Sequence, residues 1–138
     1  SNNMKKLISV ILCILLLFSL CACNGEKIVD VKVPLMESEI YSQEDISLAI
    51  STITEEFKKD WNGCTLTEIY YAGDDVSAEY QDWADRHNAD EVIVLLSSFD
   101  VDSSGGDGSL NSNSTYDNWS WILVRTAGGE WKHVDHGY

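Results

Sequence analysis

Basic residues are scarce in this chain of 138 residues. Nine Lys and Arg stand against 23 Asp and Glu, which gives a formal net charge of −14 at pH 7. Because a protein that binds nucleic acid neutralises phosphates with clustered Lys and Arg, this composition excludes a typical nucleic-acid-binding protein. Global disorder is excluded as well, because 44% of the residues are hydrophobic and 10% are aromatic.

Several common functional motifs are also missing. The sequence contains no phosphate-binding loop, nucleophile motif, zinc-ligand spacing or dinucleotide-binding fingerprint. Of the four cysteines, Cys13, Cys21 and Cys23 lie in the first 23 residues, and Cys64 stands alone in the rest. This distribution excludes an internal disulfide framework in an exported chain. We expect Cys64 to be a small buried hydrophobic residue rather than a nucleophile.

The first 22 residues have the pattern of an export signal. We interpret residues 1–3 as a remnant of expression and exclude them from the fold. Lys5 and Lys6 form a short basic region, and residues 7–22 are apolar except for two serines. A membrane-spanning helix needs about 20 apolar residues. The shorter run therefore favours a signal peptide over residues 4–22.

The sequence Leu20-Cys21-Ala22-Cys23 resembles the lipobox of bacterial lipoproteins, although Cys21 is a less usual residue at its position. In that family a diacylglyceryl group is attached to the second cysteine, which cleavage then makes the new N-terminus. The resemblance implies lipidation of Cys23 and anchoring on the extracytoplasmic face of a bacterial cell membrane. An ordinary signal peptide and an uncleaved anchor are the alternatives.

The remaining chain divides into a tether over residues 23–38 and one domain over residues 39–138, a length that suits a single folded unit. Residues 28–33 are β-prone and precede Pro34, so they form either an edge strand or an extended linker. We favour the linker.

Periodicity predicts two helices and four strands. Ser42 and Asp45 form a cap for a helix whose apolar face repeats at helical spacing up to residues 62–63, and a second helix spans residues 76–87. The predicted strands are residues 64–71, 92–99, 119–125 and 131–135. A polar loop of residues 101–118 precedes the last two strands, which form a hairpin.

This order predicts an α+β domain in which two helices pack on one face of an antiparallel sheet of about four strands. The chain resembles one protein family in the order of its elements, in the lipobox and in its C-terminal sequence. The C-terminal part of the resemblance consists of Trp-Ile-Leu-Val-Arg at 121–125 and Gly-Gly-Glu-Trp-Lys-His-Val-Asp at 128–135. This family comprises small bacterial lipoproteins of unknown function with a nuclear-transport-factor-2-like, or cystatin-like, fold. The resemblance implies a curved, cone-like sheet around a pocket. The fold hosts enzymes, binding proteins and inert modules, so it does not define a function.

An acidic loop partly matches a calcium-binding loop. Oxygen-bearing side chains recur at Asp100, Asp102 and Ser104, and Asp107 follows after two glycines. Such a spacing can direct several oxygens to one Ca²⁺, and extracellular sites of this kind bind weakly. However, Asn111 occupies the position of the usual bidentate glutamate. A flexible acidic loop without metal is the alternative, and we expect no other cofactor.

A second candidate site lies near residue 135. On a regular strand His133 and Asp135 share one face, and His136 points to the other. His133 and Asp135 are therefore candidates for a general base in a pocket, whereas the three side chains cannot bind one metal without a bend in the strand. The alternative is a structural His–Asp hydrogen bond.

The third candidate is an aromatic surface. Trp119 and Trp121 are two residues apart and share one face of their strand, opposite Ile122 and Val124. With Tyr116 they form either an exposed platform for a ligand or partner, or part of the core. We assign Trp61 and Trp83 to the core.

Three functions are compatible with these features. The first is a membrane-anchored lipoprotein whose domain binds a protein partner or small ligand without chemistry. The second is a pocket enzyme, a hydrolase or isomerase, that uses His133 and Asp135. The third is a structural or regulatory module of the cell envelope. The sequence leaves the oligomeric state open.

Overall fold

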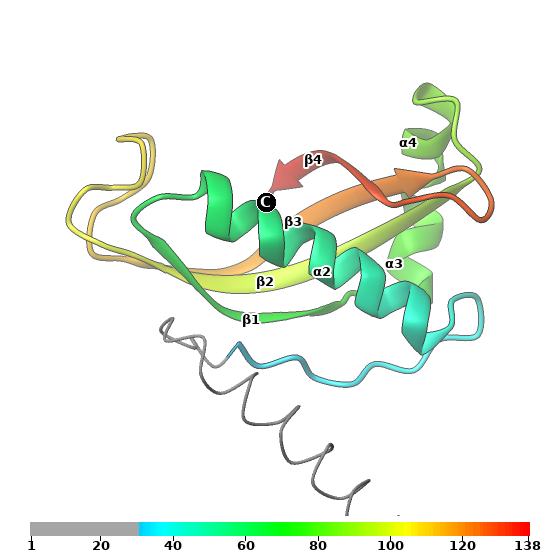
Figure 1. The fold of residues 1–138 in the computed structure, drawn as a ribbon, viewed down its shortest axis with the longest axis horizontal. Coiled ribbons are helices and arrows are strands. Elements are labelled where there is room, and N and C mark those ends of the chain that lie inside the picture. Colours follow the sequence, from blue (N-terminus) through cyan, green and yellow to red (C-terminus); the bar gives the residue numbers. More distant parts are fainter. Residues whose placement is uncertain (1–30) are drawn as a thin grey trace, which may run out of the picture.

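Four antiparallel strands form one curved sheet in the order β1-β2-β3-β4, and three helices pack against it (Figure 1). The computed structural model describes residues 31–138, so the predicted signal peptide and Cys23 lie outside the described residues. The predicted α+β class and the four-stranded antiparallel sheet are confirmed. The sheet does not close. Its elements are α2 (Gln43–Asp60), β1 (Cys64–Tyr71), α3 (Asp74–Glu79), α4 (Gln81–Arg86), β2 (Glu91–Val101), β3 (Thr115–Arg125) and β4 (Lys132–Gly137).

The long helix α2 follows from its local sequence, and its prediction is confirmed. Ser42 Oγ accepts a hydrogen bond from the backbone N–H of Asp45 at 3.1 Å, which caps the first turn. Lys58 and Lys59 in the last turn complement the helix dipole. The apolar residues repeat at helical spacing and are buried against the sheet: Ile46, Ala49, Ile50, Ile53 and Phe57.

The strands agree with the predicted ones in number and order, but three differ in extent. Strand β2 spans Glu91–Val101 instead of residues 92–99, and β4 spans Lys132–Gly137 instead of residues 131–135. The bounds of β1 are those predicted, but β3 begins at Thr115 rather than at Trp119. Thr115 pairs with Asp100 of β2, and Thr and Tyr favour extended backbone at this end of β3. The loop between β2 and β3 is therefore restricted to residues 102–114.

Helices cover both faces of the sheet, which corrects the prediction that they share one face. The α2 face carries a large cluster of buried residues from α2 and all strands but β4. The opposite face, the α3/α4 face, buries a smaller cluster, and Figure 1 shows α3 and α4 behind the sheet when α2 lies in front. Apolar side chains on both faces of β2 and β3 require this second cover. The smaller cluster consists of Ala84, Val92, Val94, Ile122 and Val124.

The predicted second helix is divided in two. Tyr80 ends α3 and precedes α4, and its backbone torsions of φ −105° and ψ 14° are not helical. The break changes the direction of the chain, so that Val76 of α3 and Ala84 of α4 both reach the α3/α4 face. A single straight helix over residues 76–87 is thus not formed.

Residues 31–38, which the sequence places in the tether, lie against the domain. Lys32 forms a parallel bridge beside Glu68 of β1, with its N–H 2.9 Å from the carbonyl oxygen of Thr67. Ser38 Oγ donates a hydrogen bond to Asp74 at 2.6 Å. This segment therefore protects the outer edge of β1. Within residues 31–138, no helix combines the length and apolar character that crossing a membrane requires.

Candidate functional site

The two tryptophans of β3 belong to the α2 face, and Trp121 is part of its core. Trp121 is 0% exposed, and its Nε1 donates a hydrogen bond to Ser97 Oγ at 2.7 Å. Trp119 is half-buried and packs against the same cluster. Ile122 and Val124 lie on the other face, as their spacing predicts. The structure therefore assigns Trp121 to the core and not to an exposed platform.

Tyr116 extends the aromatic cluster towards the loop of residues 102–114. Its ring stacks on Phe99 with centroids 5.2 Å apart and an interplanar angle of 12°. Trp119 stands nearly perpendicular to Tyr116 at 5.4 Å. The three residues proposed as a platform are thus held by aromatic contacts within the α2 face, and only Tyr116 and Trp119 reach its margin.

A β-bulge in β4 rearranges the second candidate site. Ile122 pairs with Asp135, and the next residue, Leu123, pairs with His133, so Val134 has no partner. The extra residue breaks the alternation of side chains along β4. Asp135 is exposed beside a residue of the α3/α4 face, whereas His133 lies beside a residue of the α2 face. The prediction that His133 and Asp135 share a face is wrong.

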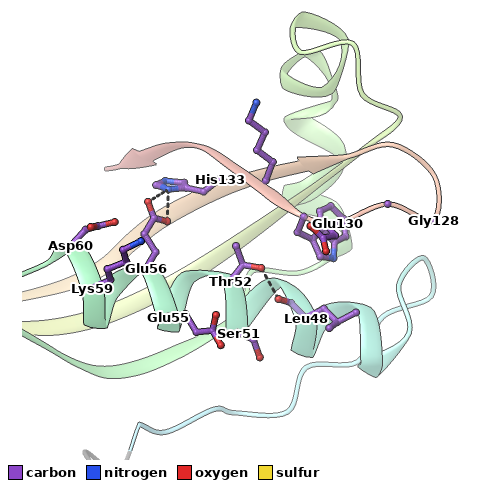
Figure 2. Close-up of a pocket in the computed structure, with 13 residues that line it drawn as sticks. Leu48, Ser51, Thr52, Glu55, Glu56, Lys59, Asp60, Gly128, Glu130 and His133 are labelled. Atoms are coloured by element: carbon purple, nitrogen blue, oxygen red, sulfur yellow. Dashed lines mark hydrogen bonds and ion pairs between the residues drawn. The ribbon is translucent and has the colours of Figure 1, made fainter.

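The bulge brings His133 and His136 together on the α2 face. Glu56 of α2 lies across from them, and His133 Nδ1 is 2.8 Å and 3.0 Å from its two carboxylate oxygens. Figure 2 shows this contact between the helix and β4. On its other side, His133 Nε2 is 3.1 Å from His136 Nδ1. These contacts form a continuous hydrogen-bonded chain, Glu56–His133–His136.

The direction of the protons in this chain follows from its chemistry. An ionised Glu56 only accepts hydrogen bonds, so His133 Nδ1 carries the proton of that contact. In a neutral His133 the Nε2 atom is then an acceptor, and His136 Nδ1 donates to it. The Nε2 atom of a neutral His136 consequently retains a lone pair. A carboxylate behind an imidazole fixes the tautomer and orientation of the ring.

Three tryptophan rings lie beside His136, which remains partly open to solvent. The ring centroids of Trp61, Trp121 and Trp119 lie 5.2, 5.3 and 6.0 Å from that of His136. Burial by these rings lowers the pKa of His136 below its ordinary value of 6.5, and the neighbouring His133 lowers it further. The nearby carboxylates of Asp135 and Glu56 oppose the shift. His136 is therefore neutral at pH 7.

A pocket of about 420 Å³ opens beside His136. We call it the aromatic pocket. It lies between the C-terminal end of α2, the loop of residues 102–114 and strands β1, β3 and β4. Its lining combines aromatic, apolar and acidic side chains, among them Trp61, Trp119, His136, Cys64, Leu110, Asp60 and Asp107.

The indole N–H of Trp119 has no hydrogen-bond acceptor among residues 31–138, although it is buried. The rings of Trp61, Phe99 and Tyr116 stand at 81°, 80° and 89° to this indole. Aromatic surfaces accept N–H groups only weakly. A buried donor without a strong acceptor costs free energy, so this wall of the aromatic pocket is not optimised for stability alone.

Cys64 lines the aromatic pocket but is not activated. Its thiol is half-buried, and burial together with the carboxylates of Asp102 and Asp107 raises its pKa. Within the described part of the chain, no hydrogen bond joins Cys64 to His136. The raised pKa keeps the side chain a thiol at neutral pH, and Cys64 is half-buried rather than buried as expected.

The acidic loop residues have separate partners. Asp102 accepts the backbone N–H of Ser104 at 2.8 Å, and Asp107 accepts that of Ser109 at 2.9 Å. These bonds, together with those of the serine hydroxyls, lower the pKa of both aspartates. Asp100 accepts from Thr115 at 2.7 Å. Across residues 31–138, no three His, Cys, Asp or Glu side chains are placed to hold a metal; calcium binding by this loop stays a prediction.

A second, wider hollow of about 980 Å³ runs between α2 and the turn that joins β3 to β4 (Figure 2). Glu55, Lys59 and Glu130 line it, and the Glu56–His133 contact lies at one end. The side chains there carry both signs of charge. Trp131 and His133 contribute aromatic rings to this open groove, and the rest of its lining is mostly polar or charged.

The sequence did not identify Glu56 as a partner of His133, because Glu56 matched the polar side of an amphipathic helix. No local sign such as glycine or proline marks the bulge at Val134. Comparison with protein-family models, curated protein sequences and solved structures gave no match to this chain.

Proposed function

We propose that this chain is a lipoprotein, anchored through Cys23 to the extracytoplasmic face of a bacterial membrane, whose domain binds a small ligand without transforming it. The aromatic pocket is the ligand site. The lipobox-like sequence at residues 20–23 supports the anchor, and the pocket supports the binding function.

The observation that carries the binding proposal is the composition of the aromatic pocket. Small-ligand sites are concave, usually have volumes of about 300–1,000 Å³, and combine apolar walls with a few polar groups. The aromatic pocket has about 420 Å³ and draws its walls from four separate segments of the chain. A core that served only stability would place Leu or Phe where Trp119 leaves a buried N–H without an acceptor.

The Glu56–His133–His136 chain favours a second candidate function, a pocket enzyme with His136 as general base. Its Nε2 lone pair is available, and the carboxylate at the far end would stabilise the imidazolium that forms. This proposal replaces the His133–Asp135 pair. It predicts that nuclear magnetic resonance spectra of a bound ligand change with time, and that His136→Asn abolishes the change while the ligand still binds.

A ligand screen tests the binding proposal directly. We expect fragments that quench tryptophan fluorescence and raise the melting temperature of the full chain in a nonionic detergent. Leu110→Trp fills the aromatic pocket without removing a wall, and it should abolish these effects. Trp83→Phe, on the α3/α4 face, is the matched control and should leave them unchanged. Equal binding to the Leu110→Trp variant would contradict the proposed site.

Mass spectrometry tests the anchor separately. We expect the membrane fraction to contain a chain that begins at Cys23 and carries two ester-linked acyl groups and an intact domain. Cys23→Ser should release the protein from the membrane, because the lipid supplies the anchor. An unmodified Cys23 in a protein that remains membrane-bound would contradict this part of the proposal.

A further inference from the structure

We infer that the aromatic pocket binds a small organic ammonium ion. The inference rests on the proposed function, since it names the chemical class of the ligand for the same site.

The charged groups of the aromatic pocket are all acidic. Asp60 at the end of α2 and Asp107 in the loop line it, and no Lys or Arg of residues 31–138 does. Neither aspartate takes part in any of the ion pairs formed within residues 31–138. Hydrogen bonds from Ser109 hold one oxygen of Asp107 in place and keep this carboxylate ionised at neutral pH. The pocket therefore has negative charge that no side chain in the described part of the protein neutralises by an ion pair.

The walls of the pocket suit a cation with an apolar surface. Trp61, Trp119 and His136 are close neighbours, with ring centroids 5.2 to 6.1 Å apart. The faces of such rings attract ammonium groups, and Trp does so most strongly. His136 is neutral at pH 7 and does not repel a cation. Aromatic walls next to unpaired carboxylates recognise an alkylated ammonium group better than an inorganic ion or a neutral molecule.

Size and charge restrict the ligand further. A pocket of about 420 Å³ holds a small molecule and not a folded partner. The formal net charge of −14 attracts cations to the surface and repels phosphates and carboxylates. A free ammonium compound therefore fits the site better than a lipid headgroup, in which a phosphate accompanies the ammonium group.

Three related probes test the inference by calorimetry and tryptophan fluorescence. They are choline, its neutral isostere 3,3-dimethylbutan-1-ol, and phosphocholine, which adds a phosphate. We expect choline to bind about tenfold more tightly than the neutral isostere. Phosphocholine should bind more weakly than choline. Raising the salt concentration from roughly 0.05 M to roughly 0.5 M should weaken choline binding, because the carboxylates are screened.

Single-charge variants locate the effect. Asp107→Asn keeps the turn, since an amide oxygen can still accept from Ser109, and it should weaken choline binding about fivefold. Asp60→Asn is a second variant, which also removes an unfavourable charge from the end of α2. Asp85→Asn, in α4, changes the net charge equally and is the control. We expect it to leave choline binding unchanged.

The outcomes separate this inference from the proposed function. Equal binding of choline and the neutral isostere would overturn the ammonium class but retain a ligand pocket, and so would equal effects of the Asp107→Asn and Asp85→Asn variants. If phosphocholine binds more tightly than choline, the ligand is a lipid headgroup and the inference of a free ammonium compound is wrong. If none of the three binds, the ammonium inference fails, and the fragment screen with Leu110→Trp then decides the proposed function on its own.

Discussion

The two faces of the sheet are both covered by helices, but their chemistry differs. The α3/α4 face buries a small cluster made only of Ala, Val and Ile. The α2 face buries tryptophan, tyrosine and phenylalanine, and at its margin lie the Glu56–His133–His136 chain and the aromatic pocket. Adjacent residues of one strand, such as Trp121 and Ile122, belong to these two different environments.

This difference indicates a division of roles within a small domain. The hydrophobic cluster of the α3/α4 face is aliphatic, and the buried Ser77 of α3 accepts a hydrogen bond there from the backbone N–H of Val94 at 3.2 Å. The α2 face combines packing with hydrogen-bonding and titratable groups, which raise the cost of burial unless they have partners. Substitutions that compare equivalent positions on the two faces therefore test whether the division is real.

The largest effect is expected from Trp121→Ala. The substitution leaves a large cavity and removes the N–H that donates to the Ser97 hydroxyl, so it should lower the free energy of unfolding by about 3–5 kcal/mol. Ile122→Ala on the other face should cost about 2–3 kcal/mol. Urea unfolding followed by far-ultraviolet circular dichroism measures both. Equal losses would show that the two clusters contribute alike.

The second comparison concerns two arginines. Arg125 is only 9% exposed, contacts Asp45 at 3.0 Å and Glu91 at 2.5 Å, and lies 4.2 Å from the ring centre of Trp131. Arg86 on α4 is 56% exposed and contacts Asp82. Arg125→Met should lower the free energy of unfolding by about 2–3 kcal/mol, because two carboxylates lose their partner. The loss is smaller than for a fully buried ion pair, because both carboxylates remain partly hydrated. Arg86→Met should cost less than about 1 kcal/mol.

Acid titration checks the cause. Arg125 lowers the pKa of Asp45 below its ordinary value of 3.8. A carboxylate whose pKa is lowered by folding stabilises the folded protein at pH values above its ordinary pKa. This stability is lost as the pH falls through the folded pKa. The Arg125→Met variant should therefore not show the part of the acid-induced loss of stability that comes from Asp45. If its loss matches that of the wild type, Arg125 acts through packing alone.

Local features were predictable from the sequence, and features that depend on pairing were not. The capped helix α2 and the strand β1 agree with prediction because caps and periodicity act within a few residues. The alternation of Trp121 and Ile122 was predicted too. The sequence did not predict which face of the sheet α3 and α4 cover, because this depends on the break between the two helices at Tyr80.

The candidate site shows the same limit more clearly. Period-two alternation assigned His133 and Asp135 to one face, and a single unpaired residue, Val134, reversed that assignment. The bulge depends on the register of β4 against β3 and has no local sequence sign. Glu56 was therefore unrecognised as a partner: its helix was predicted, but the side chain expected on the solvent side is half-buried against His133.

A smaller effect is expected from the pH dependence of the α2 face. Folding lowers the pKa of His136 below its ordinary value of 6.5. At pH values between the folded pKa and 6.5, the unfolded chain therefore binds more protons than the folded protein. The free energy of unfolding should therefore decrease as the pH falls from about 6.5 through the folded pKa. Glu56, His133 and Asp135 are the charged or titratable groups that act on this histidine, and Asp60, Cys64 and Asp107 line the same pocket. His136→Gln should remove this part of the slope.

The matched control for this measurement is His87→Gln on the other side of the molecule. His87 follows α4, is exposed and stacks on Trp83 at 6.2 Å. The control should retain the pH slope that the His136→Gln variant loses. A slope that both variants retain would show that His136 does not cause it.

The smallest effect is expected from Trp119→Phe, which separates the two tryptophans of β3. Trp121→Phe breaks the 2.7 Å hydrogen bond to Ser97 and should cost about 1–2 kcal/mol. Trp119→Phe removes an N–H that has no acceptor among residues 31–138, so the gain from losing a buried donor offsets part of the lost contact area. The net change should be below about 1 kcal/mol in urea unfolding. A loss as large as that of Trp121→Phe would mean that the Trp119 indole N–H is satisfied by the surrounding rings, and that stability alone explains why tryptophan occupies this wall.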